Sequence, residues 1–257
     1  NIIGYPPEEL TGTRMLNLFE RNDMFSFLSD IQLAFEGDIQ SYYEYKLHHG
    51  NKRLEWYSIK FSMLTETYKS EPLLICNMRN ITEKKEYERM LEYISMHDQL
   101  TGLYNRIYFN EEIRRRDMQN EYPLSVIVYD LDDFKSVNDN FGHSAGDELL
   151  IECSKLVCLT LRKQDIFART GGDEFSVLLP LTSANDAETI AKRIVTRIDE
   201  CNATSKFPPI SISVGIASKE NSAVPVESIL KTADKNMYIE KREKKRAKKD
   251  AELNTNK

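Results

Sequence analysis

The chain has 257 residues, of which 40% are hydrophobic and 30% are charged, with a formal net charge of −6. The apolar content is sufficient for packed cores, the acidic balance disfavours a nucleic-acid polymer as partner, and no stretch approaches the roughly eighteen consecutive apolar residues of a membrane-spanning helix. The four cysteines show no Cys-x-x-Cys spacing and the four histidines are scattered, so we expect reduced cysteines in a cytoplasmic segment and neither a disulfide framework nor a zinc site.

Residues 1–80 are predicted to form a separate domain with an antiparallel sheet. The chain begins at Asn1 without methionine or a signal peptide, so we expect it to belong to a longer protein whose preceding part could hold a membrane tether. Two alternating runs, the first at residues 41–48, predict strands. One face of the first carries Tyr43, Tyr45 and Leu47, and one face of the second carries Tyr57, Ile59, Phe61 and Met63. Residues 73–78 are nearly all apolar, which predicts a central strand, and residues 24–35 are expected to cover the sheet.

Residues 81–97 are predicted to form a linker helix, because a capping residue and an acidic first turn follow the last strand. Its apolar residues recur at helical spacing as Tyr87, Met90, Leu91 and Ile94. One narrow apolar stripe on a charged helix suits packing against a second copy of the chain. The stripe covers only about two heptads, so a helix that caps its own domain is the alternative.

Residues 98–250 are predicted to form a second domain of mixed α and β structure, followed by a tail at residues 251–257. The helices are expected at residues 105–118, 145–161, 185–201 and from 226, and the strands at 124–129, 165–170, 174–179 and 210–217. This order predicts the ferredoxin-like split βαβ arrangement and an α+β protein overall. Gly171-Gly172 predicts a two-residue hairpin turn. Residues 235–250 hold eight basic and three acidic residues, which we interpret mainly as a solvated helix end.

Two acidic clusters of this domain are candidates for metal chemistry. Asp130 ends a buried strand and opens the sequence DLDDFK, while Asp173 and Glu174 follow the two glycines of the hairpin. Carboxylates beside a main-chain carbonyl suit Mg²⁺, which prefers oxygen ligands, although an Asp-rich turn alone would look the same. On neighbouring strands of a split βαβ sheet, the two clusters predict the palm geometry of nucleotidyl transfer.

A third polar cluster lies at residues 138–147. Asn138 and Asp147 can offer an amide and a carboxylate to the edge of a base, and a carboxylate that accepts from N1–H and N2–H₂ favours guanine. The alternative is a polar loop with a helix N-cap at Ser144 or Asp147.

Four motifs resemble the GGDEF diguanylate cyclase family in order and spacing: DQLTGLYNR at 98–106, DLDDFK at 130–135, FGHSAGD at 141–147 and ARTGGDEF at 168–175. The resemblance implies condensation of two GTP into cyclic di-GMP with release of two pyrophosphates, by a homodimer that uses Mg²⁺ or Mn²⁺. The rivals are a non-catalytic receptor for GTP or cyclic di-GMP and a cyclase with a mixed guanine–adenine product.

The resemblance also implies roles for individual residues. Asp130, the Leu131 carbonyl and Asp173 are expected to bind metal, Asp173 or Glu174 to activate the 3′-hydroxyl, and Lys135 to stabilise the transition state. The expected substrate-binding residues are Phe134, Asn138, His143, Asp147, Gly171, Gly172, Lys241 and Lys245. Lys245 stands where the family usually has Arg, so that phosphate contact loses the bidentate fork of a guanidinium.

Arg162 and Asp165 match the Arg-x-x-Asp product-inhibition site of many family members. An Arg fork can grip a guanine edge or a phosphate, and an aspartate can accept from the base. The alternative is a salt bridge at the end of a helix.

Residues 1–80 resemble the later part of a PAS sensor domain, through IGYPPEELTG at 3–12 and MRNITE at 78–83, with Asn80 in place of the usual Asp. The two opening strands of that fold are expected to be absent. Residues 24–35 contain no Cys for a flavin adduct and no His for a haem, so the ligand of this domain is unknown.

Overall fold

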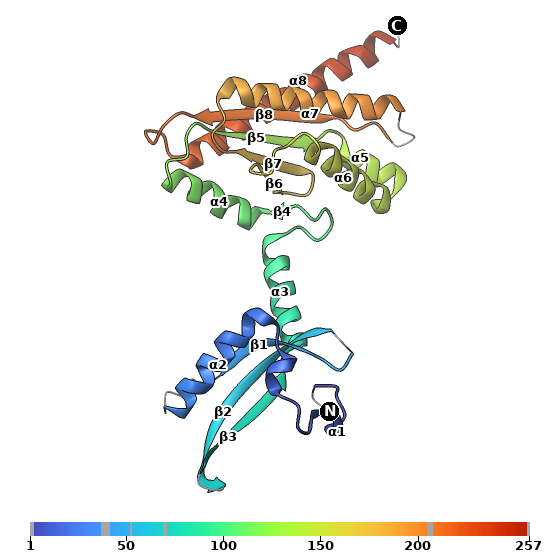
Figure 1. The fold of residues 1–257 in the computed structure, drawn as a ribbon. Helices are drawn as coiled ribbons and strands as arrows, with labels where there is room; N and C mark the ends of the chain where they lie inside the picture. The colour runs from blue at the N-terminus through green and yellow to red at the C-terminus, as the bar shows by residue number, and fades with distance from the viewer. Residues whose placement is uncertain (1–2, 37–41, 52, 69–70, 205–207, 256–257) are drawn as a thin grey trace. The chain divides into compact units, whose positions relative to one another are not determined.

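The computed structural model describes residues 3–36, 42–51, 53–68, 71–204 and 208–255. The chain divides into two compact units, Asn1–Glu92 and Tyr93–Lys257 (Figure 1), each with its own sheet and core. This confirms the α+β class. Ser41 of the first predicted strand and the last two residues of the predicted tail lie outside the described residues. Within the described part of the chain, no helix is long and apolar enough to cross a membrane.

The first unit packs helices against a three-stranded antiparallel sheet in the order β1-β2-β3. Its elements are α1 (Pro7–Leu10), the 3₁₀ helix η1 (Met15–Leu18), α2 (Arg21–Phe35), β1 (Tyr43–His48), β2 (Leu54–Tyr68) and β3 (Glu71–Asn80). The helix α3 (Thr82–Met96) follows and extends into the second unit. Asn80 stabilises the first turn of α3, because its side-chain oxygen accepts a hydrogen bond from the Thr82 N–H at 2.9 Å.

The core of the first unit lies between α2 and the inner face of the sheet. Phe27 of α2 contacts this core, which also holds the residues predicted to share one face of β1 and of β2, except Met63. Met63 lies toward the end of the β2–β3 ribbon and is 40% exposed. The prediction of a central strand at residues 73–78 was wrong. Among the described residues β3 pairs with β2 alone, and only one of its faces packs on the core, so Ile75 on the other face is exposed.

The second unit has a five-stranded sheet in the order β4-β6-β7-β5-β8. Its elements are β4 (Tyr104–Asn105), α4 (Arg106–Met118), β5 (Leu124–Leu131), α5 (Phe134–Phe141), α6 (His143–Cys158), β6 (Ile166–Arg169), β7 (Glu174–Leu179), α7 (Ala184–Thr204), β8 (Ile212–Lys219) and α8 (Val226–Thr255). Strands β6, β7, β5 and β8 are antiparallel to one another, and β4 pairs parallel with β6 at the edge. This is the predicted ferredoxin-like order, with β4, α4, α5 and α8 added to the core pattern.

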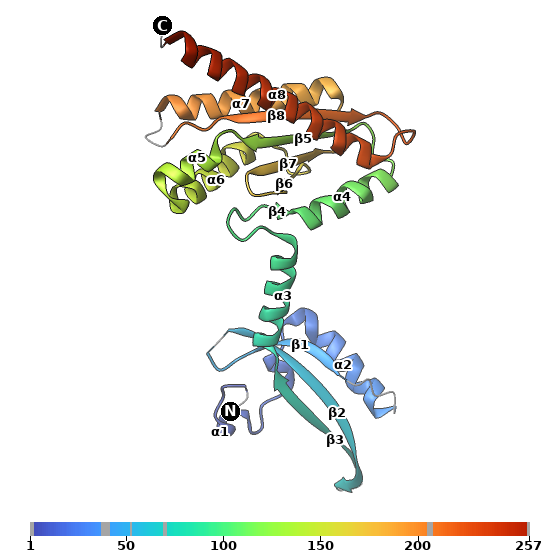
Figure 2. The same cartoon turned by 180° about the vertical axis from the view of Figure 1, so that it is seen from behind.

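Helices cover both faces of this sheet, which explains why β5 is buried along its whole length. Ile127, Tyr129 and Leu131 belong to the core beneath α6 and α7, while Val126 and Val128 belong to the core beneath α4 and α8. Figure 1 shows α7 on the near side of the sheet, and Figure 2 shows α8 across the opposite side. Asp130 and Leu131, where β5 ends, are therefore buried with the rest of the strand.

Two local predictions in this unit need correction. The alternative of a polar loop at residues 138–147 with an N-cap at Ser144 or Asp147 is wrong, because α5 ends at Phe141 and α6 begins at His143, so both residues lie inside a helix. The β6–β7 hairpin forms as predicted, but Thr170 and Gly171 both donate to the Glu174 carbonyl, at 2.9 and 3.1 Å. The loop is thus longer than two residues, and neither of its glycines has positive φ.

Candidate active site

The register of the sheet brings the two acidic strand ends together. Asp130 at the end of β5 pairs with Glu174 at the start of β7, and the Leu131 N–H donates to the Asp173 carbonyl at 3.1 Å. Asp130 is only 5% exposed, whereas Glu174 opens toward solvent. Three carboxylates from segments far apart in the sequence therefore share one end of the sheet.

The electrostatics of this cluster are those of an anionic site. Burial raises the pKa of Asp130, the charges of Asp173 and Asp132 raise it further, and Lys241 opposes the rise. Burial also raises the pKa of Glu174, and the charges of Asp130 and Asp173 add to this effect. Crowded carboxylates raise one another's pKa because each disfavours a second negative charge nearby. A cation bound here would relieve that repulsion.

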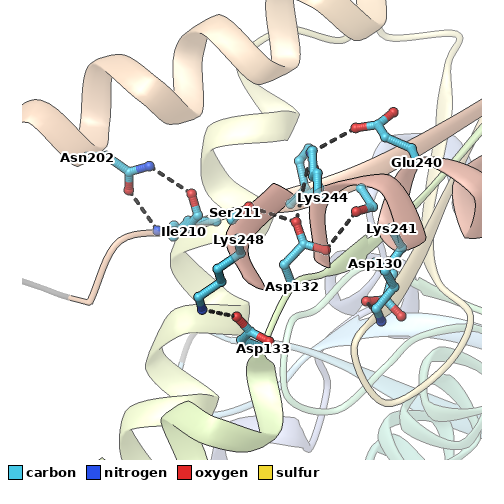
Figure 3. Close-up of polar contacts among 12 residues, drawn as sticks. Asp130, Asp132, Asp133, Asn202, Ile210, Ser211, Glu240, Lys241, Lys244 and Lys248 are labelled. Atoms are coloured by element: carbon cyan, nitrogen blue, oxygen red, sulfur yellow. Dashed lines mark hydrogen bonds and ion pairs between the residues drawn. The ribbon is translucent and has the colours of Figure 1, made fainter. Parts of the chain in front are cut away.

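Three lysines of α8 partly balance the negative charge of the aspartates at residues 130–133 (Figure 3). Lys241 donates to Asp130, Lys244 lies 3.8 Å from Asp132, and Lys248 lies 2.6 Å from Asp133. The spacing of these lysines places them along one side of the helix. The residues from 242 to 250 are exposed, as a solvated helix end requires, and only Lys241 among these three lysines is partly buried. Lys245, between them, is exposed and lines a small pocket of about 320 Å³.

Asp132 has a structural environment that the sequence analysis missed. Its carboxylate accepts hydrogen bonds from the hydroxyls of Ser211, at 2.7 Å, and Ser213, at 2.6 Å. Its N–H donates to the Ser211 carbonyl at 2.8 Å. Asp132 is thus tied to β8, while Asp130, two residues earlier, lies in the acidic cluster beside Asp173 and Glu174.

The predicted base-binding residues lie on two packed helices beside this end of the sheet. Asn138 belongs to α5, whereas His143 and Asp147 belong to the first turns of α6. His143 and Asp147 are exposed, as is Lys135 on α5, and Phe134 packs partly into the core. The side-chain oxygen of Asn138 is buried without a hydrogen-bond partner among the described residues.

The glycine hairpin is held by a clasp that the sequence analysis also missed. Arg169 donates to the Gly172 carbonyl through Nε at 3.0 Å and Nη2 at 2.7 Å. Its third nitrogen contacts both carboxylate oxygens of Asp98, at 3.1 and 3.3 Å. Because Asp98 also accepts the Thr101 N–H at 2.9 Å, one guanidinium joins the segment after α3 to the tip of the hairpin. Asp98 and Arg169 both lie within the motifs named in the sequence analysis. Their opposite charges were the signal that could have predicted this contact.

Arg162 and Asp165 lie together between α6 and β6. The Arg162 N–H donates to Asp165 Oδ2 at 2.8 Å, but no ion pair joins the two side chains in the described structure. Burial raises the pKa of Asp165, against the opposing effects of the Arg162 N–H and of the Arg162 and Arg193 charges. The pair lines a pocket of about 420 Å³. The salt-bridge alternative for this pair is therefore wrong, and Arg193 of α7 joins it as a third charged group.

The acidic cluster fits a hard divalent cation that takes most of its ligands from substrate phosphates and water. Among the described residues, no group of three or more His, Cys, Asp or Glu side chains is arranged to hold a metal ion. Asp130, Asp173 and the Leu131 carbonyl offer oxygen donors only, and the unrelieved charge of the cluster favours a cation. Mg²⁺ in nucleotide sites is commonly held by one or two carboxylates, substrate phosphates and water, and this donor set matches that mode.

Comparison with known proteins gives a consistent result for the second unit. The family model for the diguanylate cyclase GGDEF domain matches residues 95–247. The chain is 33% identical over 171 residues to diguanylate cyclase DgcM of Escherichia coli (strain K12), covering 65% of this chain and 41% of that protein. It is 39% identical over 170 residues to diguanylate cyclase TpbB of Pseudomonas aeruginosa (strain UCBPP-PA14), covering 64% of this chain and 39% of that protein.

A solved structure supports the same fold assignment. The coiled coil and GGDEF domain of DgcB from Caulobacter crescentus, in complex with c-di-GMP, aligns with a TM-score of 0.57 at 25% identity. The alignment covers 63% of this chain and 88% of that one. The chain spans about two fifths of the length of the two curated relatives above.

Proposed function

The chain belongs to the GGDEF family of diguanylate cyclases, and we propose that its second unit condenses two GTP molecules into cyclic di-GMP with release of two pyrophosphates. One observation carries this proposal: the register that pairs Asp130 with Glu174 and places Asp173 beside them. A module that only binds nucleotide has no need of this acidic cluster, so the non-catalytic receptor is the weaker alternative.

Each phosphodiester bond forms by attack of a 3′-hydroxyl oxygen on the α-phosphorus of the other GTP. The bond from that phosphorus to the bridging oxygen breaks, pyrophosphate leaves, and the hydroxyl proton passes to a carboxylate. Glu174 or Asp173 is the proposed acceptor. A raised pKa, as burial and neighbouring charge give Glu174, makes a carboxylate a stronger base.

Mg²⁺ or Mn²⁺ is the proposed cofactor, held by Asp130, Asp173 and the Leu131 carbonyl. When bound, such an ion acts as a Lewis acid on phosphoryl oxygens and neutralises developing charge. Lys241 pairs with Asp130, and nucleotide binding is proposed to exchange this partner for phosphate. Lys135 and Lys245, which are exposed, are proposed to contact the terminal phosphates with Lys241.

The proposed guanosine contacts come from α5 and α6, through Asn138, His143 and Asp147. Phe134 is proposed to contact the terminal phosphates beside Lys135. Gly171 and Gly172 let the nucleotide approach the hairpin backbone. A side chain at Gly172 would meet no atom of the described structure within 4 Å, which supports an open approach there.

We also propose that the enzyme works as a homodimer under the control of its first unit. Each domain holds one GTP in this scheme, so two domains must face each other. The stripe on α3 supports pairing of two copies, because Tyr87 and Leu91 are 63% and 67% exposed. The first unit is proposed to be a PAS-like sensor whose ligand is unknown.

Removing residues 1–97 is expected to leave a folded domain of low specific activity that rises with protein concentration. The reason is mass action, since two loaded domains must then meet without the segment that brings them together. Specific activity measured over a dilution series checks this. A truncated protein as active as the full chain at low concentration would show that residues 1–97 do not organise the dimer.

Product inhibition is proposed at Arg162 and Asp165. The buried Asp165 Oδ1 has no hydrogen-bond partner among the described residues, and it can accept from the donors of a guanine. Arg193, whose Nη2 donates to the Thr160 carbonyl at 2.7 Å, adds a second guanidinium near this carboxylate. These groups lie away from the acidic cluster, so product bound here need not compete with GTP.

Arg162→Ala is expected to give progress curves that stay linear after wild type has slowed, with little change in initial rate. Loss of a charged hydrogen bond costs about 1.5–3 kcal/mol, which weakens product binding at least about tenfold. Calorimetry with cyclic di-GMP measures the affinity directly. A variant that slows as early as wild type, or a wild type that binds no product, would contradict this assignment.

Mixing the full chain with Mg²⁺ and GTP and separating the products by chromatography tests the proposed function. Cyclic di-GMP and pyrophosphate in a 1:2 ratio, as the balanced reaction requires, would support it. Binding of GTP without turnover would instead support the receptor, and a mixed dinucleotide formed from GTP and ATP would support the third alternative.

A further inference from the structure

Gly146 on α6 lies against the side chains of two proposed substrate contacts. A Cβ built on this residue would come within 2.0 Å of the Asn138 side-chain oxygen and 3.0 Å of its Cγ, and within 3.2 Å of Phe134 Cζ. Both neighbours belong to α5, which packs against α6. Gly146 itself is buried. The bare Cα therefore lets the Asn138 amide and the Phe134 ring come close to α6.

The identity of these neighbours shows what a methyl group at position 146 would disturb. The three nearest atoms are side-chain atoms, and the closest is the tip of the Asn138 amide. A 2.0 Å contact cannot persist, so that amide must move, while the backbone of α6 can stay in place. Glycine inside a helix is less stable than alanine, so the helix itself gains nothing from glycine at this position.

The state of the Asn138 amide indicates why its position matters. Its oxygen is buried without a partner in the described structure, which is unusual for a native protein and occurs at functional sites. The amide nitrogen is not buried and has no acceptor among the described residues. One end of the amide is thus seated against Gly146, and the other end is free to meet a ligand.

We propose that Gly146 is a positioning residue for base recognition, which seats the Asn138 amide so that its free end faces the base of a guanosine nucleotide. Asp147 follows Gly146 directly on α6, so the same turn carries a carboxylate for the donors of guanine. The inference rests on the proposed function. It adds a role in specificity for a residue that acts through the Asn138 amide.

The test uses the full chain with Mg²⁺ and a non-hydrolysable GTP analogue, titrated by calorimetry. Gly146→Ala is expected to weaken binding of the GTP analogue about tenfold, or by about 1.4 kcal/mol. The ratio of its affinities for the GTP analogue and for the matching ATP analogue should also fall. The melting temperature should be unchanged or higher, because alanine favours the helix. Ser144→Ala is the matched control, since Ser144 is exposed on the same turn, and it should bind like wild type.

A double-mutant cycle with Asn138→Ala separates positioning from a general packing effect. If Gly146 acts through the Asn138 amide, adding Gly146→Ala to the Asn138→Ala variant should weaken binding of the GTP analogue by less than about threefold. An equal tenfold loss in both backgrounds would overturn the inference, as would wild-type affinity in the single variant. If Gly146→Ala fails to fold, the double variant decides: recovery of folding would support the contact with Asn138, and failure of both would overturn it.

The outcomes also separate this inference from the proposed function. A wild type that binds no guanosine nucleotide would remove both. A wild type that binds the analogue with the same affinity as Gly146→Ala would remove only the role of Gly146 and leave the cyclase proposal standing.

Discussion

Asp173→Ala and Asp130→Ala are each expected to abolish cyclic di-GMP synthesis while the fold remains intact. Removal of one preorganised electrostatic group typically costs 10²–10³-fold in rate, and these two carboxylates are the proposed side-chain metal ligands, so a loss of at least about that size is expected. Neither residue belongs to a hydrophobic core, so truncation leaves no cavity in either core. The rate should therefore fall far more than the stability.

The measurement is cyclic di-GMP formed per minute by purified full-length variants, with far-UV circular dichroism to confirm folding. Asp139→Ala is the matched control, because Asp139 is an exposed aspartate of α5 outside the proposed site, and it should keep wild-type activity. Turnover that survives in either Asp173→Ala or Asp130→Ala would remove that residue from the metal site.

Arg169→Ala is expected to reduce both activity and stability, because it opens the clasp between Asp98 and the Gly172 carbonyl. Loss of a hydrogen bond to a charged group costs about 1.5–3 kcal/mol. Displacement of catalytic groups by about 1 Å can cost about 10²-fold in rate, and the freed hairpin carries Asp173. Arg169→Lys should recover little, because an ammonium group lacks the fork that contacts both partners.

Chemical denaturation and initial rates of the same variants check the clasp. Arg197→Ala is the control, since its 3.2 Å pair with Glu200 is on an exposed helix surface and such pairs contribute about 0.3–0.5 kcal/mol. Wild-type activity in Arg169→Ala would show that the hairpin holds its position without the clasp.

The clasp also predicts how this stability difference depends on pH. Burial opposes the effect, but hydrogen bonds from Thr101 and Arg169 hold the pKa of Asp98 below its usual value. A lowered pKa in the folded state stabilises the protein above the unfolded value, about 3.9, and this contribution is lost as the pH falls through the folded value. The difference in unfolding free energy between wild type and Arg169→Ala should therefore shrink in acid.

The sequence predicted those parts of the second unit whose signals are local. A continuous apolar run at residues 124–129 was enough to place β5, and glycines between two short strands were enough to place the hairpin. The ferredoxin-like order follows from the sequence of helices and strands. The meeting of Asp130 with Asp173 was predicted because neighbouring strands of that sheet fix which ends lie together.

The parts that were missed depend on long-range register or on unusual backbone geometry. α5 follows Asp133, whose φ of 56° turns the chain sharply within a polar sequence, so the helix resembled a loop. Its spacing of Phe134, Val137 and Phe141 was the overlooked helical signal. The hydrogen bonds from two serines to Asp132 depend on the pairing of β5 with β8, about 80 residues later. No local pattern specifies that pairing.

The ion pair between Lys241 and Asp130 has a consequence for how the protein is made. These residues are 111 positions apart, and at translation rates of about 5–20 residues per second Asp130 is synthesised roughly 6–22 seconds before its partner. During most of that interval the nascent chain carries Asp130 without β8 or α8. A chain that ends before Lys241 therefore leaves the Asp130 carboxylate without its lysine partner.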